Sequence, residues 1–257
     1  MKELTTKDTY QTPGRKLSWG ARITPSWIFH MKNIGIVISA SKLSRQGHYA
    51  GDDWTQSSLD VIHALESVGV TIQAENLHAF RKLDSPCVFV GNHMSTLETF
   101  VLPCLIRPYR RVTFVIKESL VTYPFFKHVM ISRNPIVVGR ANPREDLRNV
   151  MVQGEERLRG GMSVIIFPQT TRILEFDKKQ FNSMGVKLAK RAQVPVVPIA
   201  LKSDAWGVGK RMKDFGRIDP AKTVHIAFGS PLDVGGNDKA AHQAVIEFIT
   251  TKLDSWK

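Results

Sequence analysis

Apolar and polar positions follow a regular rhythm along most of this chain. From residue 57 onward, short apolar runs alternate with longer segments in which apolar residues recur every three or four positions. Short apolar runs are typical of buried strands, and the wider spacing is typical of helices packed on a core. The runs predict strands over 70–74, 87–91, 112–116, 135–138, 163–167, 194–201 and 223–228. The spaced segments predict helices over 57–68, 95–105, 142–160, 181–192 and 239–253. This alternation predicts an α/β fold, a mostly parallel sheet flanked by helices.

Local signals refine two of these elements. Residues 142–145 (NPRE) combine an asparagine cap, a proline in the first helical position and a glutamate three residues after the cap, which marks a helix start. The run 194–201 contains Pro195 and Pro198. Because proline donates no backbone hydrogen bond, the two residues favour a strand that begins there or lies at a sheet edge.

The amino-terminal segment has a different character. Residues 1–18 are polar and predict a mobile tail or a lead-in, and their mixed charges argue against a secretory signal. We expect a domain boundary near residues 44–56, which are polar and contain glycine. The division is then a tail and amphipathic helical anchor over 1–44 and an α/β domain over 45–257.

Residues 19–43 of this segment are aromatic, basic and partly amphipathic. One interpretation is a helix packed on the core, which the pattern alone favours. The other is a helix in a membrane interface, with tryptophans at the lipid headgroups and cations against anionic lipid. Its apolar runs are too short to cross a bilayer, which needs about 20 residues. The residues that would face a membrane are Trp19, Trp27, Ile28 and Phe29, beside Arg22 and Lys32.

Composition narrows the class of partner without choosing one. Lys and Arg number 36 against 23 Asp and Glu, a formal net charge of +13. Such a balance favours nucleic acid, an acidic membrane or a phosphorylated substrate. The two cysteines, Cys87 and Cys104, lie in apolar runs and predict reduced core thiols. We find no glycine-rich nucleotide loop, no GxSxG and no HExxH spacing.

His93 is the histidine with the clearest chemical context. It follows the predicted strand 87–91, and ligands bind open α/β sheets at the carboxyl ends of strands. If Glu98 accepts the Nδ1 proton, Nε2 is left free as a general base. However, Ser95 and Glu98 also have the spacing of a capping box, in which the carboxylate bonds backbone N–H groups. Both roles of Glu98 therefore stay open.

Cations end several other predicted strands. Lys117 and Arg140 each follow an apolar strand, and Arg172 ends the turn 167–172 (FPQTTR). Because the carboxyl ends of parallel strands share one sheet edge, these cations would converge on an anionic substrate. The turn itself offers backbone N–H groups and hydroxyls that suit a phosphate or an oxyanion.

Four motifs in this order resemble the glycerolipid acyltransferase family, whose best-known members are the 1-acylglycerol-3-phosphate acyltransferases. Residues 92–98 (NHMSTLE) match the spacing of its first motif, N-H-x-x-x-x-D, and residues 167–172 lie over its third, F-P-E-G-T-R. Residues 194–199 (VPVVPI) resemble its fourth. The second motif is matched by Lys117, Pro124, Val138 and Arg140. Order and spacing agree over roughly residues 65–230.

This resemblance implies roles for the residues. His93 resembles a general base that deprotonates an acceptor hydroxyl, which then attacks a thioester, and Glu98 resembles the carboxylate that orients it. Residues of the second and third motifs resemble those that bind the acceptor. The substrate-binding candidates are Lys117, Arg140, Gln169, Thr170, Thr171 and Arg172.

Three positions depart from the family pattern. Glu98 replaces the usual aspartate, which lengthens the arm by one methylene and keeps the chemistry. Gln169 replaces a glutamate and removes a charge, and Thr170 replaces a glycine and adds a Cβ. The last two bear on which acyl acceptor is bound.

We therefore expect an enzyme, an O-acyltransferase that moves a fatty acyl group from acyl-CoA or acyl-carrier protein to a lysophospholipid, first of all 1-acylglycerol-3-phosphate, in phospholipid biosynthesis. The alternatives are a non-phosphate acceptor, such as an amino-acid-derived lyso-lipid, and a basic lipid-binding module without turnover. No metal and no cofactor besides the acyl donor are expected, and no nucleic acid. Since family members often carry amino-terminal anchoring helices, the resemblance favours the interfacial interpretation of residues 19–43, on an anionic membrane surface. The expected location is peripheral, on the cytoplasmic face of a membrane.

Overall fold

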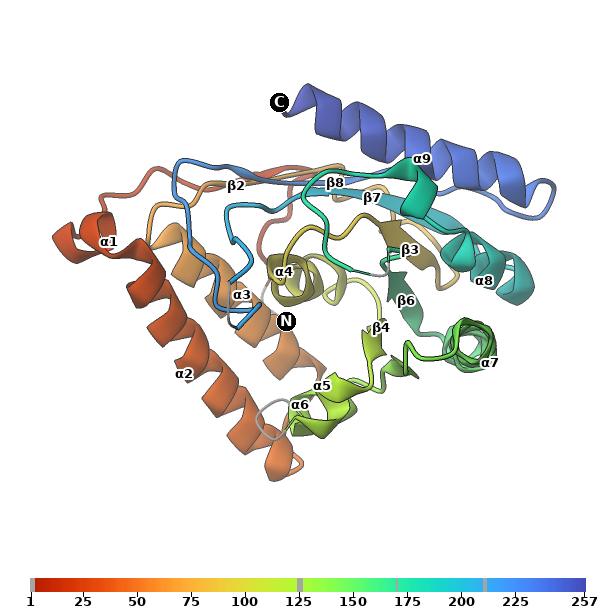
Figure 1. Cartoon of the computed structure of the whole chain (residues 1–257), viewed down its shortest axis with the longest axis horizontal. Coiled ribbons are helices and arrows are strands. Elements are labelled where there is room, and N and C mark those ends of the chain that lie inside the picture. Colours follow the sequence, from red (N-terminus) through yellow and green to blue (C-terminus); the bar gives the residue numbers. More distant parts are fainter. Residues whose placement is uncertain (1–2, 124–126, 170, 210–211) are drawn as a thin grey trace.

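A single twisted sheet forms the centre of the molecule (Figure 1). The computed structural model describes residues 3–123, 127–169, 171–209 and 212–257. Within these residues the sheet has eight strands in the order β1-β2-β8-β7-β3-β6-β4-β5. The strands are β1 Tyr10–Gln11, β2 Ile72–Glu75, β3 Val88–Gly91, β4 Val112–Lys117, β5 Ile136–Val138, β6 Ser163–Ile166, β7 Val196–Lys202 and β8 Val224–Phe228. Five of the seven neighbouring pairs in this part of the chain are parallel, and β1–β2 and β7–β8 are antiparallel. The predicted mostly parallel α/β sheet is confirmed.

Helices cover both faces of this sheet. α3 and α4 pack on one face, with α2 outside α3, and α7, α8 and α9 pack on the other. The helices are α1 Trp19–Ile23, α2 Pro25–Arg45, α3 Gly51–Glu66, α4 Leu97–Ile106, α5 Ser119–Thr122, α6 Lys127–Ile131, α7 Pro143–Arg159, α8 Met184–Ala192 and α9 Asp238–Ser255. α7 starts as predicted, because the Asn142 side chain accepts hydrogen bonds from Arg144 N and Glu145 N.

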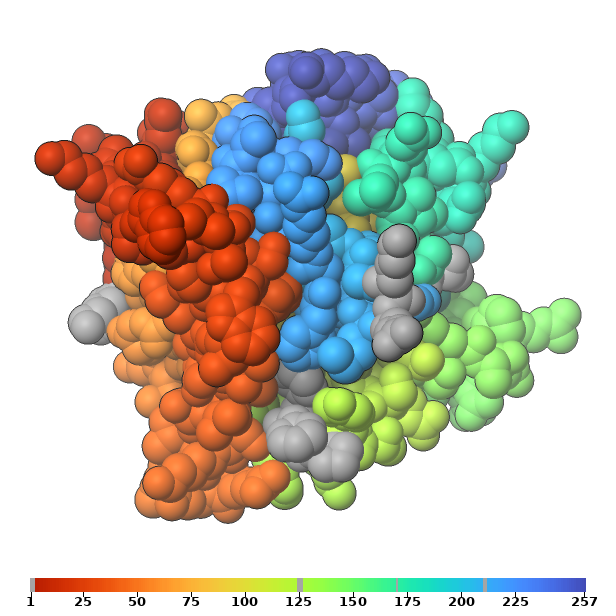
Figure 2. Space-filling view, turned by 60° about the vertical axis from the view of Figure 1, so that its left-hand side comes forward, coloured from red at the N-terminus to blue at the C-terminus, as the bar shows by residue number. Residues whose placement is uncertain are grey.

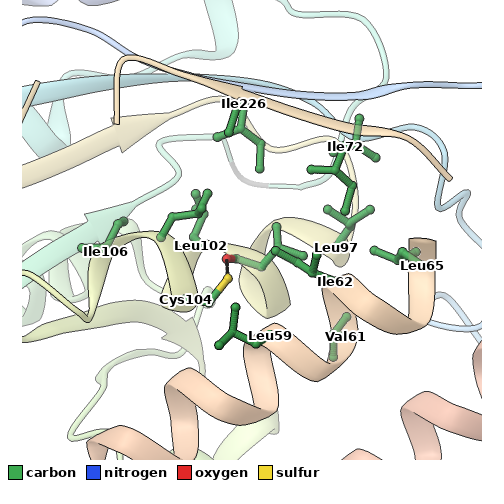
Figure 3. Packing of buried hydrophobic residues seen from close by; sticks show 14 of the residues in the cluster. Leu59, Val61, Ile62, Leu65, Ile72, Leu97, Leu102, Cys104, Ile106 and Ile226 are labelled. Carbon is green, nitrogen blue, oxygen red and sulfur yellow. Dashed lines mark hydrogen bonds between the residues drawn. The ribbon is translucent and has the colours of Figure 1, made fainter. Parts of the chain in front are cut away.

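Alternate side chains of the strands point to opposite faces of the sheet and pack in two separate hydrophobic cores. In β3, Phe89 points into the core beneath α3 and α4, whereas Val88 and Val90 point into the core beneath α7, α8 and α9. Both sets are fully buried, which explains why the strand reads as one continuous apolar run. Figure 3 shows the first core, where Leu59 and Ile62 of α3 lie near Leu102 of α4.

The amino-terminal segment is more ordered than a tail. Residues 10–11 form β1, Thr12 N donates to Ile72 O, and Leu77 N donates to Asp8 O, so the prediction of a mobile tail is wrong for this stretch. The polar stretch 44–56 is also not a connecting loop along its whole length. α3 begins at Gly51, six residues earlier than predicted, since buried Trp54 already belongs to its apolar face.

Of the two settings predicted for the prolines, the strand start is confirmed for Pro195 and the edge position is wrong. β7 lies between β8 and β3 rather than at an edge. Pro195 precedes the strand, and Pro198 falls where the β7–β8 ladder ends, with its carbonyl accepting Gly229 N at 2.8 Å. A proline is tolerated there because no N–H is needed beyond the last rung.

α1 and α2 form a ridge on one side of the molecule, beside the segment that follows β7 (Figure 2). Phe29 of α2 is fully buried and packs edge-on against Trp206 of that segment, with ring centroids 4.7 Å apart. Ile28 is half-buried. The prediction that Phe29 and Ile28 face outward is therefore wrong, whereas Trp19 and Trp27 are exposed as expected.

Candidate active site

The candidate residues gather at one edge of the sheet. β3, β6, β4 and β5 are adjacent and parallel, so their carboxyl ends lie on the same edge. His93 follows β3, residues 167–172 follow β6, Lys117 ends β4 and Arg140 follows β5. The shared edge predicted from the strand pattern is confirmed.

His93 and Glu98 are in direct contact. His93 Nδ1 lies 2.5 Å from Glu98 Oε2, and the glutamate is fully buried while 16% of the histidine side chain is exposed. Nε2 makes no hydrogen bond to any residue that the structure describes. The carboxylate thus selects the tautomer that carries its proton on Nδ1 and leaves Nε2 as the basic nitrogen.

The second carboxylate oxygen resolves the two roles that the sequence left open for Glu98. Oε1 accepts hydrogen bonds from Met94 N and Ser95 N, each at 2.9 Å, and from the hydroxyl of Ser203. One oxygen therefore binds the turn before α4, as a capping carboxylate does, and the other binds the imidazole. The same side chain makes both sets of contacts, and its orienting role in catalysis stays a prediction.

The loop after β6 holds the backbone of His93. His93 N donates to Gln169 Oε1 at 2.8 Å, and Ile173 N donates to His93 O at 2.9 Å. The ring of Phe167 stacks on the imidazole, with centroids 4.5 Å apart and planes 5° from parallel. Gln169 and Phe167 of the turn thus help to position His93, which the sequence did not reveal.

Gln169 also has an unused donor. The N–H of His93 requires an oxygen acceptor, so the amide oxygen faces His93 and Nε2 points elsewhere. That nitrogen is buried and has no hydrogen-bond partner among the residues that the structure describes. A buried unpaired amide beside the candidate site is a group that a substrate oxygen can satisfy.

The side chain of Asn92 joins β3 to β7 through hydrogen bonds and is not one of the groups of the candidate site. Its amide donates to Leu201 O at 2.7 Å and accepts from Leu201 N at 2.9 Å. The side chain thereby acts like a peptide unit that extends the contact between the ends of β3 and β7. Sequence reasoning quoted Asn92 only as part of a motif.

The predicted cations differ in their surroundings. Lys117 and Arg140 are exposed, and in the described part of the chain neither side chain makes an ion pair. Arg172 instead contacts Thr96 and pairs with Asp214, with Nη1 and Oδ1 2.8 Å apart. Arg172 thus has a protein carboxylate as its partner, and the binding of an anionic substrate by Lys117 and Arg140 stays a prediction.

The backbone at Arg140 is held in an unusual conformation. Its φ is 67°, a left-handed value that side chains rarely adopt. Both oxygens of Asp146 secure it, accepting from Gly139 N at 2.8 Å and from Arg140 N at 2.9 Å. Thr171 is exposed, and Thr170 and Pro124 lie outside the described residues.

The cysteines are poor candidates for covalent catalysis. Burial raises the pKa of the Cys87 thiol to about 11 and that of Cys104 to about 12. Both thiols are free and buried, so they match the predicted core thiols and stay protonated near neutral pH. Among the described residues, no group of three or more His, Cys, Asp or Glu side chains is arranged to hold a metal ion.

Known proteins are similar to this chain in sequence and in fold. Residues 70–202 match the family model described as Acyltransferase. A 1-acyl-sn-glycerol-3-phosphate acyltransferase of Pseudomonas aeruginosa is 38% identical over 173 residues, which cover 67% of this chain and 63% of that protein. One of Chlamydomonas reinhardtii is 28% identical over 235 residues, covering 89% of this chain and 66% of its own.

A crystal structure supports the fold. The 1-acyl-sn-glycerophosphate (LPA) acyltransferase PlsC of Thermotoga maritima superposes with a TM-score of 0.69 at 18% identity, over 90% of this chain and 93% of that one. The chain spans a little under two thirds of the length of the two curated relatives above. Since the family model covers more than half of its residues, this chain belongs to the acyltransferase family.

Proposed function

We propose that this protein is an O-acyltransferase that moves a fatty acyl group from acyl-CoA or acyl-carrier protein to the hydroxyl of 1-acylglycerol-3-phosphate. The observation that carries the proposal is the pair formed by His93 and a fully buried Glu98, with Nε2 unbonded at the sheet edge. The names of the relatives point to the same acceptor. A binding module without turnover would not need a base held in this way.

In the proposed reaction His93 acts twice. Nε2 takes the proton of the acceptor hydroxyl as its oxygen forms a bond to the thioester carbonyl carbon. Glu98 stabilises the imidazolium that results. When the tetrahedral intermediate collapses, the carbon–sulfur bond breaks and the leaving thiolate receives the proton from Nε2. The products are an ester and a free thiol.

The acceptor phosphate would be bound beside this base. Lys117 and Arg140 supply exposed positive charge at the neighbouring strand ends, and neither has a carboxylate partner among the described residues. Gln169 Nε2 supplies a neutral donor that needs an acceptor. We assign substrate binding to these three groups, with Thr170, Thr171 and Arg172 as further candidates.

One observation favours a second acceptor class. Arg172 already has Asp214 as its partner, which reduces the positive charge that it can offer to a phosphate. This pairing suits an acceptor without a phosphate, such as an amino-acid-derived lyso-lipid. A direct comparison of acceptors separates the two candidates.

The test is a transfer assay on the purified full chain. Labelled acyl-CoA and acyl-carrier protein are offered to 1-acylglycerol-3-phosphate and to a phosphate-free lyso-lipid, and the products are read by mass. We expect the phosphorylated acceptor to be the better substrate and the H93A variant to lose about 10²–10⁴ in rate. Transfer to neither acceptor, or H93A within a few-fold of the unsubstituted chain, contradicts the proposal.

We further propose that the chain binds the surface of an anionic membrane through its α1–α2 ridge, on the cytoplasmic side. Trp19 is 81% exposed and Trp27 68% exposed, although large apolar side chains are usually buried. Trp27, Met31, Ile34 and Ile38 recur every three or four positions along the outer side of α2, and all four are exposed. This stripe is apolar surface that no residue described by the structure covers.

The setting of this stripe supports an interface with lipid. Exposed Arg22 and Lys42 flank it, and cations near an anionic headgroup layer strengthen binding. Phe215 and Met212 on the segment after β7 are also exposed, and Phe215 packs on His30 of α2 with centroids 5.3 Å apart. Figure 2 shows this segment directly beside the ridge. In the described part of the chain no helix has the length and apolarity needed to cross a bilayer.

Point substitutions test this membrane proposal better than removal of the segment, because the segment also contributes to the core. We expect W27S/I38S to co-sediment less with anionic vesicles than the unsubstituted chain, in low and in high salt. The matched control is L147S/V152S, which removes two exposed apolar side chains from α7, on the opposite side of Figure 1. Equal loss in both double variants, or loss in neither, contradicts the proposal.

A further inference from the structure

Ser203 lies at the end of β7 and is fully buried. Its hydroxyl contacts Glu98 Oε1 on one side and the hydroxyl of Ser95 on the other, at 3.0 Å. An ionised carboxylate has no proton to give, so Ser203 donates to Glu98 and therefore accepts from Ser95. Ser95 Oγ in turn accepts Leu97 N at 3.1 Å. All these hydrogen bonds run in one direction, from the first turn of α4 toward the carboxylate.

We infer that Ser203 is a positioning residue for the base of the proposed acyl transfer and that it acts through Glu98. This inference rests on the proposed function. Two of the three donors on Oε1, Met94 N and Ser95 N, belong to the same turn as Glu98 itself. Ser203 is the one that comes from a different segment, directly after β7, so it ties the carboxylate to the end of that strand. With Oε1 fully occupied, Oε2 is the oxygen that remains for His93.

The fold explains why a residue at position 203 reaches this carboxylate. Asn92 joins the end of β3 to Leu201 through two hydrogen bonds. Ser203 follows two residues later and so has the same orientation as Leu201 along the strand. His93 follows Asn92 directly. The two hydrogen bonds between Asn92 and Leu201 therefore bring His93, Glu98 and Ser203 close together.

The hydroxyl also affects the charge on the pair. A hydrogen bond to a carboxylate stabilises its ionised form and weakens its hold on a nearby proton. Without Ser203, Glu98 would hold the proton that it shares with His93 more tightly. Other charged groups on the adjoining segments have partners of their own: Arg172 pairs with Asp214, Asp204 pairs with Lys222, and Lys202 donates to the Trp256 carbonyl.

The experiment compares S203A with a matched buried serine. Ser58 of α3 is also buried, and its hydroxyl makes three hydrogen bonds to α4: it donates to Phe100 O at 2.5 Å and to Val101 O at 3.3 Å, and it accepts Cys104 N at 3.0 Å. S58A therefore perturbs the same helix without touching Glu98. Both variants are assayed for transfer from acyl-CoA to 1-acylglycerol-3-phosphate over a range of pH.

For S203A we expect kcat to fall about tenfold, because one hydrogen bond to a charged group is lost. The KM for each substrate should stay within about twofold, since the serine contacts neither, and the dependence of the rate on pH should differ from that of the unsubstituted chain. S58A should lower the melting temperature and leave kcat and the profile unchanged. S203C, with a weaker donor of similar size, should lie between S203A and the unsubstituted chain.

Proton NMR supplies a readout that does not depend on turnover. The proton between His93 Nδ1 and Glu98 should give a far-downfield signal, since the two heavy atoms are 2.5 Å apart. We expect S203A or, if that variant does not fold, S203C to shift this signal while S58A leaves it in place. An S203A profile and signal like those of S58A overturn the inference. An unsubstituted chain that shows the signal but transfers no acyl group overturns the proposed function instead.

Discussion

Exchange of Glu98 for glutamine removes one charge and changes almost no volume. The amide has two possible orientations. If its NH₂ group faces the turn, it opposes the N–H groups of Met94 and Ser95 and the hydroxyl of Ser203, and each buried donor left unsatisfied costs about 1–3 kcal/mol. If the NH₂ group faces His93, a single conflict arises with Nδ1–H, which the imidazole removes by moving its proton to Nε2. The second orientation therefore has the lower free energy. In that orientation Nε2, the nitrogen that would act as the base, already carries a proton.

The expected result for E98Q is a large loss of rate with a modest loss of stability. The same change of tautomer in a serine-protease triad lowers kcat by about 10⁴, and we expect a loss of about 10³–10⁴ here. The lost charge-assisted hydrogen bond is worth about 1.5–3 kcal/mol, or about 3–10 °C in melting temperature for a chain of this size.

The assay follows release of the free thiol from acyl-CoA in the presence of 1-acylglycerol-3-phosphate, beside a thermal melt of the same preparation. A capping role alone would leave the rate almost unchanged, because glutamine also serves in a capping box. An E98Q protein with at least a third of the original kcat would refute the orienting role. A rate loss matched by a collapse of the melting temperature would refute the account of the two orientations.

Three further predictions concern the rest of the molecule. D214N should release Arg172 and lower the KM for a phosphorylated acceptor by up to about fivefold, the most that a partly exposed ion pair is worth, and an unchanged KM would make that arginine structural. G185A should destabilise the protein by about 1–3 kcal/mol in a denaturant titration, because a Cβ there would lie 2.6 Å from Val90 Cγ2, and a melt at or above the original midpoint would contradict this close packing. Burial, and then a neighbouring lysine, lower the pKa of His242 below its ordinary value of 6.5, so the folded chain resists protonation that the unfolded chain accepts. This contribution is complete above pH 6.5 and is lost as the pH falls, so H242Q should show a smaller drop in melting temperature between pH 7 and pH 5, and an identical drop would count against it.

Local patterns in the sequence were sufficient to predict most of the fold. Strands such as β3 are buried on both faces, and α7 has its cap and its first-turn proline side by side in the chain, so short windows were sufficient to find them. The edge that joins His93, Lys117 and Arg140 followed from the parallel order of the strands. The pairing of His93 with Glu98 is also local, since five residues separate them.

Contacts between distant segments could not be predicted from short stretches of the sequence. The partners Arg172 and Asp214, or Glu98 and Ser203, are joined by the return of the chain after β7, and no short window contains both. The same holds for Phe29. Its neighbours Trp27 and Ile28 are similarly apolar, and only the packing of Trp206 against α2 determines which of the three is buried.

The order in which the strands are synthesised differs from the order in which they can join the sheet. β3, β6, β4, β5 and β7 lie within residues 88–202 and can assemble as soon as these have been made. β1 and β2 emerge earlier but join the sheet only through β8, whose last residue is Phe228. The amino-terminal strands thus wait through most of synthesis with one edge of β2 unpaired. A nascent or truncated chain that stops between β7 and β8 presents that edge, together with the open edge of β7, as a template for association with other chains.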